Sequence, residues 1–184
     1  KIKFNGTQKT KIALGIAHTI NYLNKLGIVH GDLTLNNILI DQNYEPVICD
    51  FGNTKYLSEP LNPVGTPGYA PPEIWPCNNF TTNDPRSDVY GFAAILWELA
   101  VGEKFPGGKI PSTDSVSDKI EDVNIRFIYN LCRANHPSQR CDFDFILKLI
   151  MSGKFMFEGS DYEEVKNYYF KLQNSCLPPE EYIP

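Results

Sequence analysis

The sequence is poor in the residues that build disulfide frameworks and zinc sites. It contains 184 residues with three histidines and five cysteines, and the cysteines form no C-x-x-C pair. This spacing predicts neither a set of structural disulfides nor a zinc centre. We therefore expect free thiols and a cytoplasmic, reducing environment.

Long apolar runs and clusters of basic charge are also missing. The longest apolar stretch, from Val89 to Val101, is interrupted by Glu98 and is too short for a bilayer core of about 30 Å. The 17 Lys and Arg residues are scattered and the net charge is -5, whereas a nucleic-acid surface requires clustered basic side chains. We expect neither a membrane span nor a nucleic-acid partner.

Enough apolar residues are present for one core, since 42% of the chain is hydrophobic and 12% aromatic, as in a single domain. Apolar residues spaced three and four apart predict helices over residues 10–26, 86–101, 123–131, 143–150 and 162–172. Gly27 and Gly102 are expected to end the first two. Ser160 and Glu163 resemble a capping box before the last.

Short β-branched runs predict strands at residues 28–29, 38–40 and 47–49. The turn-rich residues 41–46 favour a hairpin between the second and third runs. The sequence thus predicts a mainly α fold with a few short β-strands. The polar loop 30–37 and Asp50 both follow strand ends, so we expect their side chains to converge.

This polar loop reads His30-Gly31-Asp32-Leu33-Thr34-Leu35-Asn36-Asn37 and is followed by Asp50-Phe51-Gly52. A carboxylate such as Asp32 can orient a hydroxyl nucleophile. The oxygens of Asn37 and Asp50 are hard ligands of the kind that Mg²⁺ prefers. Asp-Phe-Gly alone is a weak signal, but the preceding loop makes coincidence improbable. These are the groups that phosphoryl transfer requires.

The two motifs resemble the catalytic and magnesium loops of eukaryotic-type protein kinases. The resemblance implies a kinase-like C-terminal lobe, which is one half of an α+β two-lobe fold. It places that lobe at residues 1–172, with the catalytic loop at 30–37, the activation segment at 50–73 and a tail at 173–184.

The resemblance also implies roles for single residues. Asp32 would position the substrate hydroxyl, and Asn37 and Asp50 would hold the Mg²⁺ that accompanies ATP. Leu39 would lie in the nucleotide site. Phe51, followed by Gly52, would anchor Asp50 in the core beside His30.

Further matches follow downstream. Gly65-Thr66-Pro67-Gly68-Tyr69-Ala70-Pro71-Pro72-Glu73 is similar to the end of a kinase activation segment. By the resemblance, Thr66 supports Asp32, Asp88 holds backbone amides of the catalytic loop, and Arg140 pairs with Glu73. The pairing of Thr66 with Tyr69 looks like the Ser/Thr kinase arrangement. The tyrosine-kinase-like group of Ser/Thr kinases is resembled at Cys49, Val89-Tyr90 and Trp97-Glu98-Leu99.

The chain also departs from the family pattern. Gly31 replaces an Arg that captures phosphate on the activation loop, and Thr34 replaces a Lys that faces the γ-phosphate. Losing one such electrostatic contact can lower a rate by about ten- to a thousand-fold. The stretch between Gly102 and Cys132 is shorter than the family pattern, with a Gly-, Pro- and Ser-rich loop predicted at 106–117 in place of an extra helix. The Gly-rich loop, Lys and Glu of the N-terminal lobe are not found, so we expect either truncation of a longer product or a naturally shortened paralogue.

Two functions remain open. The first is the catalytic lobe of an ATP- and Mg²⁺-dependent Ser/Thr kinase that acts on a protein substrate and is incomplete without the N-terminal lobe of its parent chain. The second is a pseudokinase or scaffold that binds partners without phosphotransfer. An atypical or small-molecule kinase ranks third, because such kinases lack the segment from Gly65 to Glu73.

Overall fold

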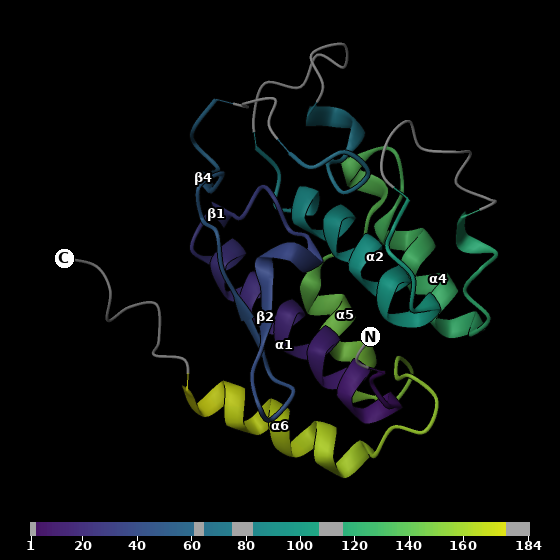
Figure 1. Ribbon diagram of the computed structural model, residues 1–184. Helices are drawn as coiled ribbons and strands as arrows, with labels where there is room; N and C mark the ends of the chain where they lie inside the picture. Colours follow the sequence, from purple (N-terminus) through teal and green to yellow (C-terminus); the bar gives the residue numbers. More distant parts are fainter. Residues whose placement is uncertain (1–2, 61–64, 75–82, 107–115, 176–184) are drawn as a thin grey trace.

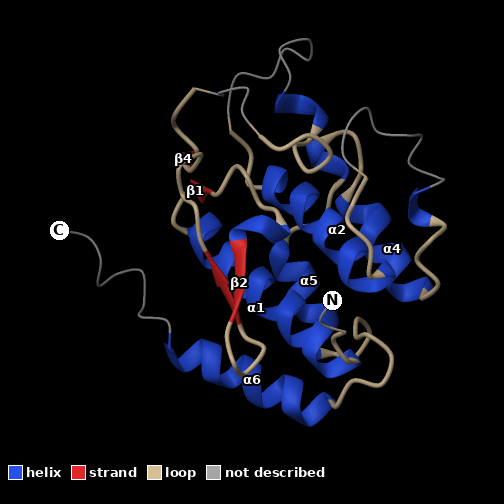
Figure 2. Ribbon diagram, viewed as in Figure 1, coloured by secondary structure: helices blue, strands red, loops and turns tan. Residues whose placement is uncertain are grey.

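The computed structural model describes residues 3–60, 65–74, 83–106 and 116–175 (Figure 1). Helices dominate and strands are short and few (Figure 2), which confirms the predicted fold class. The α-helices are α1 (Gly6–Lys25), α2 (Arg86–Val101), α4 (Val123–Cys132), α5 (Phe143–Met151) and α6 (Tyr162–Ser175). Short 3₁₀ turns cover Leu35–Asn37, Pro72–Ile74 and Pro137–Gln139.

Helix α2 packs against α4, while α1 packs against α5 and, along the bottom of Figure 1, against α6. All residues of α2 from Asp88 to Leu99 are buried, as expected of a helix that is apolar on almost every face. Its bounds match the prediction. Gly102 ends it in a left-handed conformation, with φ 75°, which glycine adopts without a steric penalty.

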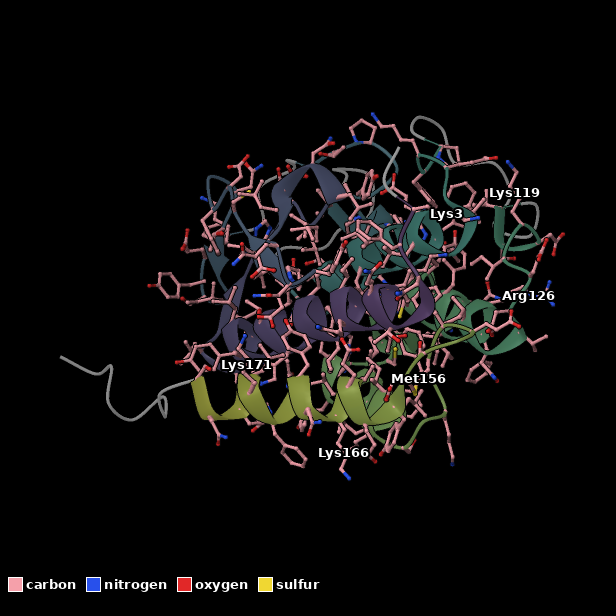
Figure 3. All side chains as sticks on the ribbon, turned by 60° about the horizontal axis from the view of Figure 1, so that its bottom comes forward. Lys3, Lys119, Arg126, Met156, Lys166 and Lys171 are labelled. Atoms are coloured by element: carbon pink, nitrogen blue, oxygen red, sulfur yellow. The ribbon has the colours of Figure 1, made fainter. Side chains whose placement is uncertain are left out.

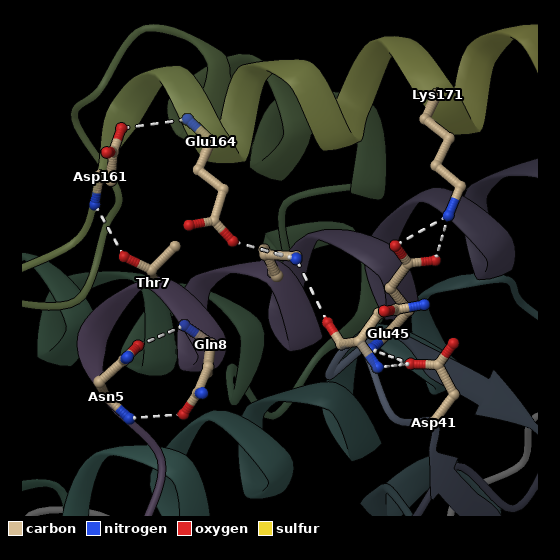
Figure 4. Close-up of polar contacts among 10 residues, drawn as sticks. Asn5, Thr7, Gln8, Asp41, Glu45, Asp161, Glu164 and Lys171 are labelled. Atoms are coloured by element: carbon tan, nitrogen blue, oxygen red, sulfur yellow. Dashed lines mark hydrogen bonds and ion pairs between the residues drawn. The ribbon is translucent and has the colours of Figure 1, made fainter.

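Helix α1 begins at Gly6, earlier than the predicted start at Thr10. Asn5 and Gln8 form a capping box in which the Asn5 Oδ1 accepts from the Gln8 N–H at 2.9 Å (Figure 4). The Gln8 Oε1 accepts from the Asn5 N–H at 3.0 Å. The prediction missed this turn because it followed the apolar spacing alone.

Helix α6 is capped by Asp161, whose Oδ1 accepts from the Glu164 N–H at 3.1 Å (Figure 4). The predicted capping box at Ser160 and Glu163 was therefore wrong. The Ser160 hydroxyl instead hydrogen-bonds Thr10 Oγ1 at 2.8 Å, which ties the start of α6 to α1. Helix α6 continues to Ser175, past the predicted lobe boundary at residue 172, and that boundary remains a prediction.

Ion pairs also fasten α6 to the rest of the domain. Lys171 pairs with Glu45 at 2.7 Å (Figure 4), and Lys11 of α1 pairs with Glu164 at 3.1 Å. Figure 3 shows Lys171 on the side of α6 that faces the domain and Lys166 on the opposite side. The expected packing of this helix on the lobe is confirmed, with Val165 and Tyr168 buried.

The strands are β1 (Ile28–Val29), β2 (Ile38–Ile40), β3 (Pro46–Ile48) and β4 (Lys55–Tyr56). Strands β2 and β3 form the predicted antiparallel hairpin, with Ile38 opposite Ile48. Strand β4 pairs with β1 and was not predicted, since Lys55 and Tyr56 do not form a β-branched run like that of β1. In the described part of the chain, no helix is both long and apolar enough to cross a bilayer.

Candidate active site

The loop that follows β1 is held from beneath by Asp88 of α2. This side chain is 1% exposed. Its Oδ2 accepts from the His30 N–H at 2.9 Å and its Oδ1 from the Gly31 N–H at 3.0 Å. Burial raises the pKa of Asp88, and the two amide donors act in the opposite direction. The predicted contact between Asp88 and the loop amides is confirmed.

The carboxylate of Asp32 is oriented by residues on both sides of the loop. Its Oδ1 accepts from the hydroxyl of Thr66 at 2.7 Å and from the Thr66 N–H at 3.0 Å. The Asn37 amide donates to the Asp32 carbonyl at 2.8 Å and lies 3.4 Å from Oδ2. Thr66 thus supports Asp32 as expected, and Oδ2 carries the weaker of these bonds.

Asn37 and Asp50 are joined through the backbone between them. The Cys49 N–H donates to the Asn37 carbonyl at 2.9 Å, so the next residue, Asp50, follows directly beside Asn37. Asp50 is exposed, has φ 62°, and accepts a 3.2 Å bond from the Gly52 N–H. Both hydrogen bonds of the Asn37 amide nitrogen go to Asp32, which leaves its side-chain oxygen for another partner.

These oxygens fit a hard cation. The Asp50 carboxylate and the Asn37 amide oxygen are ligand types that Mg²⁺ accepts, and the metal usually completes its shell with waters and phosphate oxygens. Among the described residues, no group of three or more His, Cys, Asp or Glu side chains could hold a metal ion. Asn37 and Asp50 alone would leave most of a Mg²⁺ shell to be completed, so they suit a metal shared with a phosphate ligand better than a metal held by protein side chains alone.

His30 and Phe51 lie against each other, with ring centroids 5.2 Å apart. The His30 Nε2 lies 3.3 Å from the Cys49 carbonyl. That oxygen can only accept, so Nε2 carries the proton and Nδ1 accepts from the Asp32 N–H at 3.4 Å. Phe51 itself is 49% exposed. Its predicted contact with His30 is present, but its predicted place in the core was wrong, because the chain is at the surface at Asp50 and about half of the Phe51 side chain stays exposed.

The end of the segment from residue 50 to 73 is fixed by a buried ion pair. Arg140 Nη1 lies 2.5 Å from Glu73 Oε1, and Nη2 lies 2.7 Å from Oε2. Both residues are 4% exposed. The guanidinium also donates to the carbonyls of Ala134, Asn135 and Arg86, so its charge is well satisfied. The predicted pair is confirmed.

Comparison with known proteins agrees with this geometry. The family profile described as protein kinase domain matches residues 1–167. The chain belongs to the protein kinase family. Two probable serine/threonine-protein kinases of Dictyostelium discoideum are 39% identical over 106 residues and 31% identical over 148 residues, covering 56% and 74% of this chain.

A leucine-rich repeat receptor-like serine/threonine/tyrosine-protein kinase of Arabidopsis thaliana is 33% identical over 141 residues, or 72% of this chain. The chain spans only 11%, 10% and 21% of these three relatives. The architecture is that of a kinase C-terminal lobe, as predicted.

Gly31 is required by the backbone path of the loop 30–37. Its φ is 81°, and a Cβ atom placed on it would lie 2.6 Å from the Asn53 carbonyl oxygen. A side chain at this position would need both a strained backbone and a shift of that carbonyl. The Arg that the family pattern led us to compare with Gly31 is thus incompatible with the present arrangement.

Two other predicted site residues lie in different surroundings. Leu39, in the middle of β2, is exposed next to its strand partner Val47, which is also exposed. Both therefore contribute to an open apolar face. Thr34 is buried just before the 3₁₀ turn that carries Asn37, so its side chain does not lie on the open surface. The catalytic role assigned to this position remains a prediction.

Arg133 is a residue of the site that the sequence did not reveal. It is buried, its Nη1 donates to the Gly68 carbonyl at 2.8 Å, and its guanidinium lies 3.7 Å from the centroid of Tyr90. Beside it, the Tyr69 hydroxyl donates to Glu98 at 2.8 Å, and burial together with Glu98 raises the Tyr69 pKa. A single Arg after a helix gives no pattern from which these contacts could be predicted.

Proposed function

We propose that this lobe, as part of a complete kinase, transfers the γ-phosphate of ATP to Ser or Thr residues of protein substrates. The observation that carries the proposal is the orientation of Asp32. Thr66 occupies its Oδ1 with two hydrogen bonds, so Oδ2 would be the oxygen that meets an incoming hydroxyl. A carboxylate placed in this way can align the nucleophile and accept its proton.

The remaining residues would hold the nucleotide. Asn37 and Asp50 supply amide and carboxylate oxygens for Mg²⁺, and the bound metal would neutralise charge on the phosphates. The exposed side chain of Leu39 offers an apolar surface for the nucleotide base. The His30 ring connects two backbone groups: one nitrogen contacts the Cys49 carbonyl and the other accepts from the Asp32 N–H. His30 would thereby fix the backbone on both sides of the site.

We further propose that the nucleotide site is closed by an N-terminal lobe outside this sequence. Leu39 and its strand partner Val47 are exposed, and so is Phe51, which directly follows Asp50. We expect such a lobe to cover these apolar side chains. Either a longer reading frame encodes that lobe or another chain supplies it. Sequencing the transcript upstream of the codon for Lys1 distinguishes the two, because only the first predicts a Gly-rich loop and a Lys there.

The test of phosphotransfer is an assay with radiolabelled ATP on the protein from the complete reading frame. Asp32→Ala is expected to lower the rate by about 10²- to 10⁴-fold, the usual contribution of general base catalysis. Asp118→Ala, at an exposed position, serves as the matched control and should retain the wild-type rate. Equal rates for wild type and Asp32→Ala would refute the proposal.

The pseudokinase alternative rests on Gly31 and Thr34. The first leaves no space for a phosphate-binding Arg, and the second puts a buried hydroxyl where active relatives place a cation. Thermal unfolding with ATP separates the two functions. A stabilisation that requires Mg²⁺ favours the enzyme, whereas no stabilisation under any condition favours a scaffold.

We also propose a cytoplasmic location for this lobe. In the described part of the chain Cys49, Cys132 and Cys141 are free thiols, which is typical of a reducing compartment. Protease protection in selectively permeabilised cells tests this, since a lobe on the cytoplasmic side is digested as soon as the plasma membrane is opened.

A further inference from the structure

Two cysteines that are separate in the sequence meet at the end of α4. Cys132 is the last residue of that helix, and Cys141 directly precedes Asp142, the N-cap of α5. Their sulfur atoms lie 3.6 Å apart. The 3₁₀ turn Pro137–Gln139 lies between them in the sequence. The chain turns back there, which brings the two thiols together.

Both thiols are held in place by anchored neighbours. Next to Cys141, Arg140 makes its two bonds to Glu73 and three more to backbone carbonyls. On the other side, the Asp142 carboxylate caps α5 through the Phe145 N–H at 2.7 Å. Next to Cys132, Arg133 is fixed by Gly68. The approach of the two sulfurs is therefore set by the fold and does not depend on a free loop.

We propose that Cys132 and Cys141 are a reversible redox site that forms an intramolecular disulfide when the protein meets a peroxide. A disulfide bond is about 2.05 Å long, so the sulfurs must approach by roughly 1.5 Å, a movement that side-chain rotation with a small backbone shift can provide. In reducing compartments such bonds are usually transient and used for redox sensing.

The geometry also sets the order of the two steps. Cys132 is 0% exposed and Cys141 is half-buried, so a peroxide reaches Cys141 first. The hydrogen bond from the Cys132 thiol lowers the pKa of Cys141, and burial raises the pKa of Cys132. Cys141 is accordingly the better source of the reactive thiolate.

The chemistry balances with hydrogen peroxide as the oxidant. The Cys141 thiolate attacks one peroxide oxygen, the O–O bond breaks, and Cys141 becomes a sulfenic acid as hydroxide leaves. The Cys132 sulfur then attacks the sulfenic sulfur. The S–S bond forms, the S–O bond breaks, and the thiol proton leaves with the hydroxyl as water. The two cysteines together lose two electrons, and the peroxide gains them.

The site lies beside the contacts that hold the end of the activation segment. Arg133 and Arg140 stand between the two cysteines in sequence and bind Gly68 and Glu73. The disulfide would close a covalent ring around the residues that make these contacts. This inference goes beyond the proposed function, and its chemistry does not require phosphotransfer.

Peptide mapping tests the proposal directly. The full-length protein is treated with hydrogen peroxide, blocked with N-ethylmaleimide and digested with trypsin without reduction. Cleavage after Arg133 and Arg140 places the cysteines in separate peptides, 127–133 and 141–148. We expect these peptides to appear linked, with a mass two hydrogens below their sum, and to separate after dithiothreitol.

Two observations on the same protein decide the outcome. Cys49, which is also half-buried, is the internal reference and should remain alkylated. If Cys141 oxidises but no linked peptide forms, the proposal is overturned. It is equally overturned if the link joins two chains, which mixing ¹⁵N-labelled and unlabelled protein would reveal.

Variants test the order of the steps. In Cys132→Ser the sulfenic acid on Cys141 has no resolving thiol, so labelling of Cys141 by dimedone should rise several-fold over wild type. In Cys141→Ser, Cys132 should resist both peroxide and dimedone because it is buried. Rapid labelling of Cys132 in a variant with a wild-type circular dichroism spectrum would contradict the assigned order.

Discussion

The two ends of the segment from Asp50 to Glu73 are held in opposite ways. Glu73 is buried and shares two short bonds with Arg140, whereas Asp50 is exposed and accepts one bond from the Gly52 N–H. Both carboxylates stand in equally clear motifs. The difference indicates that Glu73 is used by the fold, whereas the exposure of Asp50 is what the metal-binding role proposed for it requires.

The strongest test of this contrast removes the cation from the buried pair. Arg140→Ala should lower the free energy of unfolding by about 3–5 kcal/mol, because it leaves the Glu73 carboxylate buried without a partner. Urea titration followed by circular dichroism measures the loss. Lys171→Ala removes an ion pair whose lysine is 58% exposed and should cost less than about 1 kcal/mol.

Similar losses for the Arg140 and Lys171 variants would show that burial does not distinguish the two pairs. A small loss for Arg140→Ala alone would mean that Glu73 finds other donors when the guanidinium is removed. Arg140→Lys refines the test, since lysine keeps the charge but cannot make both bonds to the carboxylate.

A second test examines how the start of the segment meets the catalytic loop. Gly31→Ala is expected to cost about 2–4 kcal/mol of unfolding free energy, from the left-handed backbone and the contact with the Asn53 carbonyl. Gly102→Ala is the matched control. Its φ of 75° is similar, but no atom of the described residues lies within 4 Å of the added Cβ, so about 1–2 kcal/mol is expected. Equal costs would show that the Asn53 carbonyl moves aside freely.

A third test concerns the support of the loop from α2. Asp88→Asn replaces one carboxylate oxygen with an NH₂ group that faces a backbone N–H. An unsatisfied buried donor costs about 1–3 kcal/mol, and thermal or urea unfolding should show a loss of that size. Asp144→Asn, at a half-exposed carboxylate paired with Lys25, should change stability by less than about 1 kcal/mol. If Asp88→Asn left the free energy of unfolding unchanged, the hydrogen bonds to the loop amides would not depend on the negative charge of Asp88.

Much of the fold could be predicted from local pattern. Helix α2 and the hairpin were found because dense apolar sequence, Gly102 and a turn-rich connection give strong signals. The caps were harder. Asn5 and Asp161 cap their helices because their side-chain oxygens accept from backbone N–H groups of the first turn. Ser160 is also a common capping residue, so the sequence alone does not show which of the two neighbours, Ser160 or Asp161, caps α6.

The site divides in the same way. The contacts of Asp88, Thr66 and Arg140 were predicted because the family pattern carries information on residues far apart in the chain. The exposure of Phe51 and the meeting of Cys132 with Cys141 had no such guide. Both depend on how the backbone turns in three dimensions, at Asp50 and after α4, and spacing along the sequence does not encode those turns.

The smallest expected change in stability belongs to Asp50 and is the sharpest test of the contrast. Asp50→Asn introduces a residue that tolerates φ 62° and keeps an acceptor for the Gly52 N–H, so the free energy of unfolding without ligand should change by less than about 0.5 kcal/mol.

In the full-length protein, ATP at about 100 times its Kd should add about 2.7 kcal/mol to wild-type stability in the presence of Mg²⁺. A neutral side-chain amide is a weaker Mg²⁺ ligand than a carboxylate, so this stabilisation should fall markedly in Asp50→Asn, whereas Asp118→Asn should retain it. A large loss of stability without ligand would make Asp50 a structural residue like Glu73. Full retention of the Mg²⁺-dependent gain would remove it from the metal site.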